Sequence, residues 1–196
     1  MNLRVLVTGA AVAALAGATA AFGSPAAGGR GVVSATGAVG TLRIDRSSEA
    51  AVRAFAGRPA FSRVGRSDPS MPRYRALGYS CLRSPAPGRR DPLLSGPRGT
   101  PRSNVYCQTI YYVDLTSGKL AAFYTGSSAF HTPRGTRVGM SQSEAASRER
   151  SAPQGGCNLQ ILLRTKTAAL SIPITGGKVL DFALESTGHP VGLQFC

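Results

Sequence analysis

The sequence GTRVGMSQSEAASR (residues 135–148) decides how the chain divides, because a related stretch, GTLRIDRSSEAAVR (residues 40–53), lies about half the chain length earlier. Without any gap, glycine, threonine, serine, glutamate, two alanines and arginine coincide in the two stretches. Repetition over such a distance is typical of a duplicated structural unit. We therefore expect two related modules, residues 39–130 and 131–196.

Both copies carry signals for the start of a helix. Ser141 and Glu144 have the spacing of a capping box, in which the serine hydroxyl accepts from a helical amide and the glutamate reaches back. In the first copy Arg46 stands at the aligned cap position, so Asp45 or Ser47 is expected to cap that helix. The predicted helices span residues 47–56 and 141–150.

Two regions have the composition of β-strands. Residues 105–125 are β-branched and aromatic around a Thr-Ser-Gly turn, which predicts a hairpin. Residues 159–185 predict a three-stranded meander with a Thr-Gly-Gly-Lys turn at 175–178. Alternation there places Phe182 toward a core and Asp181 and Glu185 toward water. Because Pro173 has no N–H to donate, its strand is expected at an edge or bulged.

The resulting order is helix, irregular segment, hairpin, helix and meander. This order predicts an α+β fold of two related helix-plus-antiparallel-sheet modules. The irregular segment is a proline- and arginine-rich arm over residues 58–104, within which a short strand is expected at 74–82.

The N-terminus reads as an export signal. Residues 1–20 combine Arg4, an apolar run and an Ala-Thr-Ala cleavage site at 18–20, and the run is too short to span a membrane. The glycine-rich residues 21–38 are expected to form a disordered leader. We therefore expect a secreted or cell-wall-associated protein without a transmembrane helix after processing.

All four cysteines lie in the exported part, which predicts two disulfides. Four cysteines allow three connectivities; if each module closes on itself, the pairs are Cys81–Cys107 and Cys157–Cys196. The alternative is metal binding or a catalytic thiol, but no C-x-x-C spacing occurs. We expect no metal site and no cofactor.

The chain of 196 residues has a formal charge of +14, and most of its basic residues are arginine. Codon bias in a GC-rich genome is one explanation of this arginine content. The other is that the positive charge serves to attract a polyanion. The arm concentrates arginines, so it is the expected contact with a cell-wall polyanion, and a protein is the alternative partner. The candidate binding residues are Arg83, Arg89, Arg90, Arg98 and Arg102.

No catalytic motif stands out, and we assign no catalytic residue. His131 and His189 are the only histidines, so an envelope hydrolase or transferase would depend on one of them. Four tyrosines on the hairpin could form a recognition surface for a protein or sugar. The alternative, which we favour, is that half of them face the core and the others follow strand propensity. The four are Tyr106, Tyr111, Tyr112 and Tyr124.

The repeated stretch also resembles a known module. The first copy has a glycine, a serine, a glutamate and a closing Gly-x-Pro at Gly40, Ser48, Glu49, Gly57 and Pro59; the second keeps Gly135, Gly139, Ser141, Ser143 and Glu144. This arrangement is similar to the tandem modules of the β-lactamase-inhibitory-protein fold and of SmpA/OmlA-type lipoproteins. The resemblance implies a protein-binding scaffold more often than an enzyme.

These observations lead to one functional expectation and one alternative. The expectation is a secreted, non-catalytic binding or envelope-associated protein that contacts polyanions through the basic arm. The alternative is a cell-envelope hydrolase or transferase that uses His131 or His189.

Overall fold

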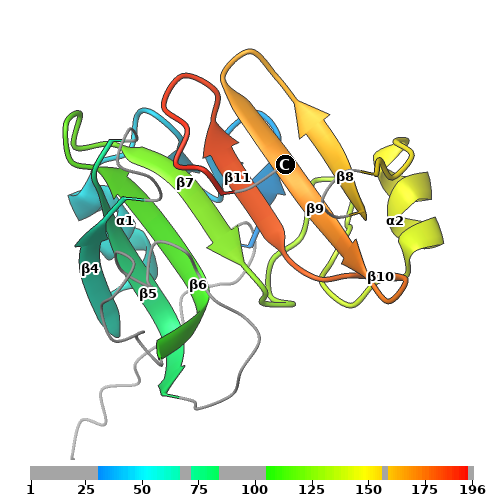
Figure 1. Ribbon diagram of the computed structural model, residues 1–196, viewed down its shortest axis with the longest axis horizontal. Coiled ribbons are helices and arrows are strands. Elements are labelled where there is room, and N and C mark those ends of the chain that lie inside the picture. The colour runs from blue at the N-terminus through cyan, green and yellow to red at the C-terminus, as the bar shows by residue number, and fades with distance from the viewer. Residues whose placement is uncertain (1–30, 67–71, 84–104, 156–158, 194–196) are drawn as a thin grey trace, which may run out of the picture.

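A computed structural model describes residues 31–66, 72–83, 105–155 and 159–193; for Leu82, Arg83, Val105 and Tyr106 it describes the backbone alone. The described residues are built on one large antiparallel sheet, with one helix behind one end of it and the other helix beside the opposite end (Figure 1). Buried residues of both helices, Val52 and Ala145, join the same apolar cluster. No helix in the described ranges is long and apolar enough to cross a membrane.

The large sheet has eight strands. From one edge, the order is β4 (Phe61–Gly65), β5 (Tyr74–Arg83), β6 (Val105–Asp114), β7 (Leu120–Thr125), β11 (Phe182–Ser186) and β9 (Ala168–Thr175); β8 (Leu159–Arg164) and β10 (Lys178–Val179) both pair with β9. All of these pairings are antiparallel. The hairpin predicted over 105–125 is present as β6 and β7.

The predicted fold class is wrong, because the strands do not divide into two helix-plus-sheet modules. The last strand of the first half, β7, pairs with the last strand of the second half, β11, with Tyr124 opposite Ala183. This pairing satisfies backbone groups that would otherwise form two exposed edges. Sequence alternation indicates strands but not which strands pair. The described residues form a continuous β-rich sheet with two short helices.

Helix α1 (Glu49–Ala56) begins at Ser48, whose hydroxyl accepts from the Ala51 amide at 3.3 Å. The prediction of Asp45 or Ser47 as the cap is therefore wrong. The Ser47 hydroxyl instead accepts from the Arg43 amide in the preceding turn.

Helix α2 (Gln142–Glu149) begins at Ser141, as predicted, and the Ser141 hydroxyl accepts from the Glu144 amide at 3.3 Å. The Glu144 carboxylate pairs with Arg148. The second half of the predicted capping box, the return of Glu144 to the cap amide, is replaced by this i,i+4 ion pair.

Three strands of two residues each lie beside α1: β1 (Val33–Ser34), β2 (Ala38–Val39) and β3 (Leu42–Arg43). They overlap the leader predicted to be disordered, so that prediction is wrong for residues 31–38. The apolar pair Val33 and Val39, opposite each other in this small sheet, is fully buried. We call residues 31–56 together with 126–150 the helix layer.

The predicted arm is also ordered where the structure describes it. Residues 61–65 form the edge strand β4, and the short strand predicted at 74–82 is the ten-residue β5. Full-length pairing with β6 supplies the apolar contacts that the arm lacks by itself. Residues 84–104 lie outside the described residues.

Two apolar clusters lie on opposite faces of the sheet. The larger packs the helix layer, including Val39, Val52 and Ala145, against sheet residues such as Phe123 and Phe182. The smaller joins Ile110 and Tyr112 to Val191 and Leu193 of the C-terminal segment. We call residues 187–193 the C-terminal strap and the face that it covers the strap face.

Pro173 lies in β9, a strand that has neighbouring strands on both sides. Opposite it the chain is interrupted at Leu180–Asp181, between β10 and β11, and the Leu180 amide donates to the Pro173 carbonyl. The missing N–H of proline is thus accommodated by an interruption of the neighbouring strand, not by an edge position.

Candidate functional site

Little is described of the five candidate binding arginines. Arg83 ends β5 with only its backbone described, and the other four lie outside the described residues: Arg89, Arg90, Arg98 and Arg102. The described part of the arm contributes exposed arginines of its own, Arg58, Arg66 and Arg73.

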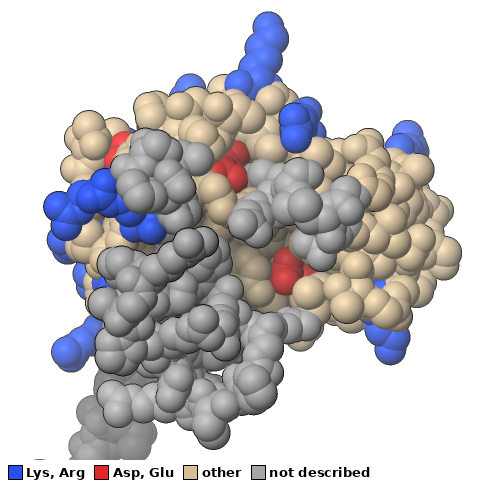
Figure 2. All heavy atoms as spheres, in the orientation of Figure 1, with Lys and Arg blue, Asp and Glu red and all other residues tan. Residues whose placement is uncertain are grey.

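These arginines belong to a basic edge, which we define as Arg53, Arg58, Arg66, Arg73 and Arg75. Glu49 is the only acid in α1, β4 and β5, and it pairs with Arg53 at 2.7 Å and with Arg75 at 3.5 Å. One carboxylate thus serves two guanidinium groups. Lys and Arg side chains gather at the end of the molecule that carries α1 and β4 (Figure 2).

A second basic group surrounds α2 and consists of Arg134, Arg137, Arg148 and Arg150. Arg148 pairs with Glu144 at 2.9 Å and donates to the Gly135 carbonyl, and Arg134 donates to the Glu149 carbonyl. Arg150 caps the helix in the left-handed conformation. All four arginines are exposed.

The Glu149 carboxylate has a structural role beneath this group. It is buried and accepts from the Thr132 hydroxyl at 2.5 Å and the Thr136 hydroxyl at 2.6 Å. Because a buried carboxylate requires such partners, this contact ties the 132–136 turn to α2 and leaves Glu149 unavailable to a ligand.

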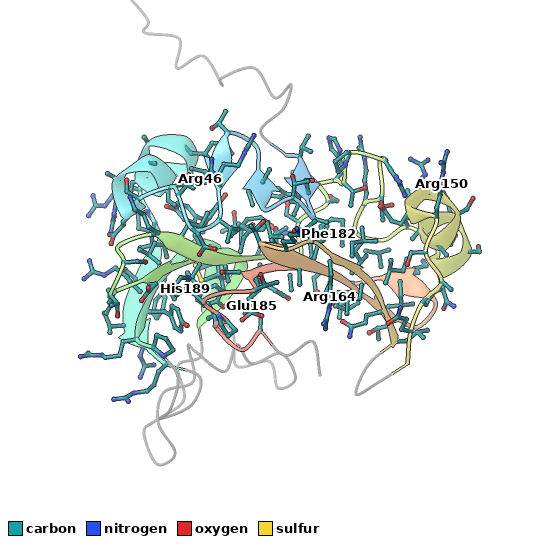
Figure 3. All side chains as sticks on the ribbon, turned by 90° about the horizontal axis from the view of Figure 1, so that it is seen from above. Arg46, Arg150, Arg164, Phe182, Glu185 and His189 are labelled. Atoms are coloured by element: carbon teal, nitrogen blue, oxygen red, sulfur yellow. A yellow bond between two sulfur atoms is a disulfide. The ribbon has the colours of Figure 1, made fainter. Side chains whose placement is uncertain are left out.

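The acidic residues in and just before β11 contradict the prediction that they face water. Asp181 and Glu185 are both buried on the strap face, where Asp181 accepts from the Tyr124 hydroxyl at 3.2 Å. In a view along the sheet, Glu185 lies on the side opposite the helix layer (Figure 3). The C-terminal strap covers this face, a contact that strand alternation does not predict.

Glu185 and Tyr74 hold the strap by its backbone. Glu185 accepts from the Val191 amide and from the Gly192 amide at 2.6 Å, and Tyr74 donates to the Pro190 carbonyl at 2.6 Å. Burial raises the pKa of Glu185, although the strap amides oppose the shift. Burial, with the nearby carboxylates of Asp114 and Glu185, raises the pKa of Tyr74 to about 12.

Asp114 is a third carboxylate near the strap. Burial acts to raise its pKa, but hydrogen bonds from the Thr116 and Ser117 amides and the Ser117 hydroxyl outweigh that effect and hold the pKa below its usual value. Asp114 is therefore a turn-forming carboxylate. Among the described residues, no group of three or more metal-ligating side chains has the geometry to hold a metal ion.

The structure separates the two histidines. His131 lies in the helix layer, where its Nδ1 is 2.8 Å from the Thr132 carbonyl oxygen. His189 is exposed on the strap, with its Nδ1 3.4 Å from Asp45 Oδ1. The Ser186 hydroxyl donates to the other oxygen of Asp45 at 2.7 Å. Ser186 and His189 thus both contact the carboxylate of Asp45. In a catalytic triad the serine instead contacts the imidazole.

The hairpin tyrosines are mainly structural. Tyr111 and Tyr112 are buried on opposite faces, and Tyr124 is half-buried beside Asp181. The side chain of Tyr106 lies outside the described part. Two of the three described tyrosines thus pack in the apolar clusters of the sheet, and the third is partly exposed.

Of the predicted disulfides, Cys81–Cys107 is present and joins directly opposed positions of β5 and β6. Cys157 and Cys196 lie outside the described residues. Gly78 makes the bridge possible, because a Cβ at this position would lie 2.4 Å from Cys107 Sγ and 2.9 Å from Cys81 Sγ. A disulfide is typical of proteins outside the reducing cytoplasm.

Glu185→Gln tests the electrostatics of the strap. Because burial raises the folded-state pKa of Glu185 above its unfolded value, the folded protein binds this proton more tightly. The resulting stabilisation is present at low pH and is lost as the pH rises through the folded pKa. Wild type should therefore lose stability relative to Glu185→Gln between about pH 4 and pH 7.

Urea unfolding of both proteins at the two pH values measures this difference. The matched control is Glu144→Gln, because Glu144 is exposed on α2. A difference between wild type and Glu185→Gln that is independent of pH, or that changes in the opposite direction, would contradict the assignment.

Comparison with known proteins does not assign a family. No family model and no curated protein matches the chain. Among solved structures, an extracellular SCP-domain protein from Bacillus anthracis aligns with 11% identity and a TM-score of 0.45, over 72% of this chain and 43% of that protein. A DUF4309 family protein from Bacillus subtilis aligns with 12% identity and a TM-score of 0.34, over 76% and 84%. The chain thus spans under half of the first structure.

Proposed function

We propose that this protein is a secreted, non-catalytic binding protein of the cell envelope or its surroundings that contacts polyanions through its arginines. The observation that carries the proposal is the basic edge, where the described residues of α1, β4 and β5 supply one carboxylate, Glu49, and this carboxylate pairs with Arg53 and Arg75. A surface region in which exposed cations such as Arg58 and Arg73 outnumber the described acids attracts anionic polymers. The Cys81–Cys107 bridge supports an oxidising compartment outside the cytoplasm.

The double variant Arg58→Gln/Arg73→Gln is expected to weaken binding to purified cell-wall material about thirtyfold, at roughly 1 kcal/mol for each cation near an anionic surface. Co-sedimentation across a salt series measures this loss. Because exposed charges are screened over about 8 Å at physiological ionic strength, wild-type binding should also weaken steeply with salt.

The matched control is Arg164→Gln/Lys166→Gln, which removes the same charge at the β8–β9 turn. Equal losses in both double variants would mean that net charge alone attracts the polymer. Absence of wild-type binding at low salt would contradict the proposal.

One contact favours a second candidate, a hydrolase or transferase that uses His189. A carboxylate beside Nδ1, as Asp45 is, orients an imidazole and leaves Nε2 directed outward as a general base. Because Ser186 donates to Asp45, the group that His189 would activate is a bound water or a substrate hydroxyl.

His189→Ala should then abolish turnover of cell-wall material and leave both folding and binding intact, whereas His131→Ala should retain turnover. Release of soluble wall fragments measures the activity. Equal activity of His189→Ala and wild type would eliminate this candidate.

A further inference from the structure

The helix layer presents cations at both of its ends. Arg46 precedes α1, and Arg137 and Arg150 flank α2; all three are exposed. Within the described ranges, none of these three side chains has a hydrogen-bonding or ion-pair partner. Arg46 and Arg150 lie on the same side of the sheet and toward opposite ends, whereas Glu185 lies on the other side (Figure 3).

The acids of the helix layer do not neutralise these arginines, because each acid is already engaged. Glu49 pairs with Arg53 and Arg75, and Glu144 pairs with Arg148. Glu149 is buried against two threonine hydroxyls. Asp45 accepts from Ser186 and lies beside His189.

The two ends are too far apart for one small anion. The α1 end is anchored over β5 through the contact between Glu49 and Arg75, and the α2 end is anchored at β10, where Ser141 bridges to Lys178. β10 and β11 lie in line on the same side of β9, so β6 and β7 separate β5 from them. Three strand spacings of about 4.8 Å place the anchors about 14 Å apart across the sheet. The register places them about seven residues further apart along the strands, about 23 Å at roughly 3.3 Å per residue. Only an extended anion reaches both.

Resting on the proposed function, we propose that the helix layer binds a linear phosphate-repeat polymer at both ends simultaneously. Guanidinium groups match phosphate oxygens in a bidentate manner, which favours a phosphate polymer. The exposed large apolar side chains among the described residues, Leu115 and Leu159, lie outside the helix layer. The layer therefore offers no large apolar anchor for a lipid bilayer, and a soluble or wall-linked polymer fits it better.

The test compares inorganic polyphosphate chains of increasing length with tripolyphosphate by titration calorimetry on the full chain. Bivalent contact predicts an abrupt gain in affinity, about a hundredfold, once the polymer spans both ends. Arg46→Gln should remove this gain and leave tripolyphosphate binding at the α2 end unchanged. Arg150→Gln should also remove the gain in affinity for long polyphosphate, because it weakens the contact at the α2 end. Arg137→Gln provides a second variant at that end, since Arg150 also caps α2.

Arg164→Gln is the matched control, since Arg164 lies on the other side of the sheet (Figure 3). Affinity that rises only in proportion to chain length, or equal losses in Arg46→Gln and Arg164→Gln, would overturn the inference. Tighter binding to anionic phosphatidylglycerol vesicles than to long polyphosphate would also overturn it. If cell-wall binding needs Arg58 and Arg73 while Arg46→Gln and Arg150→Gln keep the length dependence, the proposed function stands and this inference fails.

Discussion

Replacing both Cys81 and Cys107 by serine is expected to lower the free energy of unfolding by about 3.5 kcal/mol. The bridge closes a loop of 26 residues, and the estimate follows from the chain entropy that such a loop removes from the unfolded state. The bridge also ties β5 to β6 close to the C-terminal end of β5 and the N-terminal end of β6. Because small proteins are stable by about 5–15 kcal/mol, this loss is a large share of the total.

Urea unfolding of the oxidised protein, the reduced protein and Cys81→Ser/Cys107→Ser measures the effect. The double variant should unfold at a lower urea concentration than the oxidised protein, and the reduced protein, which also lacks the second predicted pair, should be no more stable than the double variant. A loss below about 1 kcal/mol would mean that pairing of β5 with β6 already restricts the unfolded chain. Cys157→Ser/Cys196→Ser, followed by mass mapping of disulfides, tests the second predicted pair.

Phe123→Ala is expected to cost about 3–5 kcal/mol in the free energy of unfolding. Phe123 is fully buried in β7, and its ring centroid lies 4.9 Å from that of Tyr111 and 5.1 Å from that of Phe130. Removing the ring leaves a cavity between the sheet and the helix layer and deletes two aromatic contacts.

Thermal and urea unfolding of Phe123→Ala measure this cost, with Leu115→Ala as the control. Leu115 is 39% exposed in the turn after β6, so its truncation should change stability by no more than about 0.5 kcal/mol. If Phe123→Ala lost as little stability as Leu115→Ala, the core beside the helix layer would have relaxed to fill the space of the missing ring.

The sequence predicts local structure better than the pairing of distant strands. The serine cap at Ser141 and the β6–β7 hairpin depend on neighbouring residues, and both are present. The pairing of β7 with β11 and the strap contacts of Glu185 join residues far apart in the chain. Local alternation contains no information about such contacts, so Glu185 was expected to face water.

The binding site is predictable only in part for a related reason. Charge composition indicates the basic character of residues 58–104, and the described part of that segment contributes to the basic edge. The position of Arg46 and Arg150 on one side of the sheet depends on the fold of the helix layer. The contact between Asp45 and His189 depends on the strap crossing back to the β3–α1 turn, and no spacing in the sequence indicates that crossing.

The position of β11 affects the order in which the protein can fold. It lies between β7 and β9, yet it is the last of the described strands along the chain. During synthesis from the N-terminus, β7 therefore retains an unpaired edge until residues 182–186 appear, and β4 through β7 have no partner on that side. Contacts of such large sequence separation form slowly and leave edges open to association between chains. A nascent chain that stalls before β11 should therefore be more prone to aggregation than the completed protein.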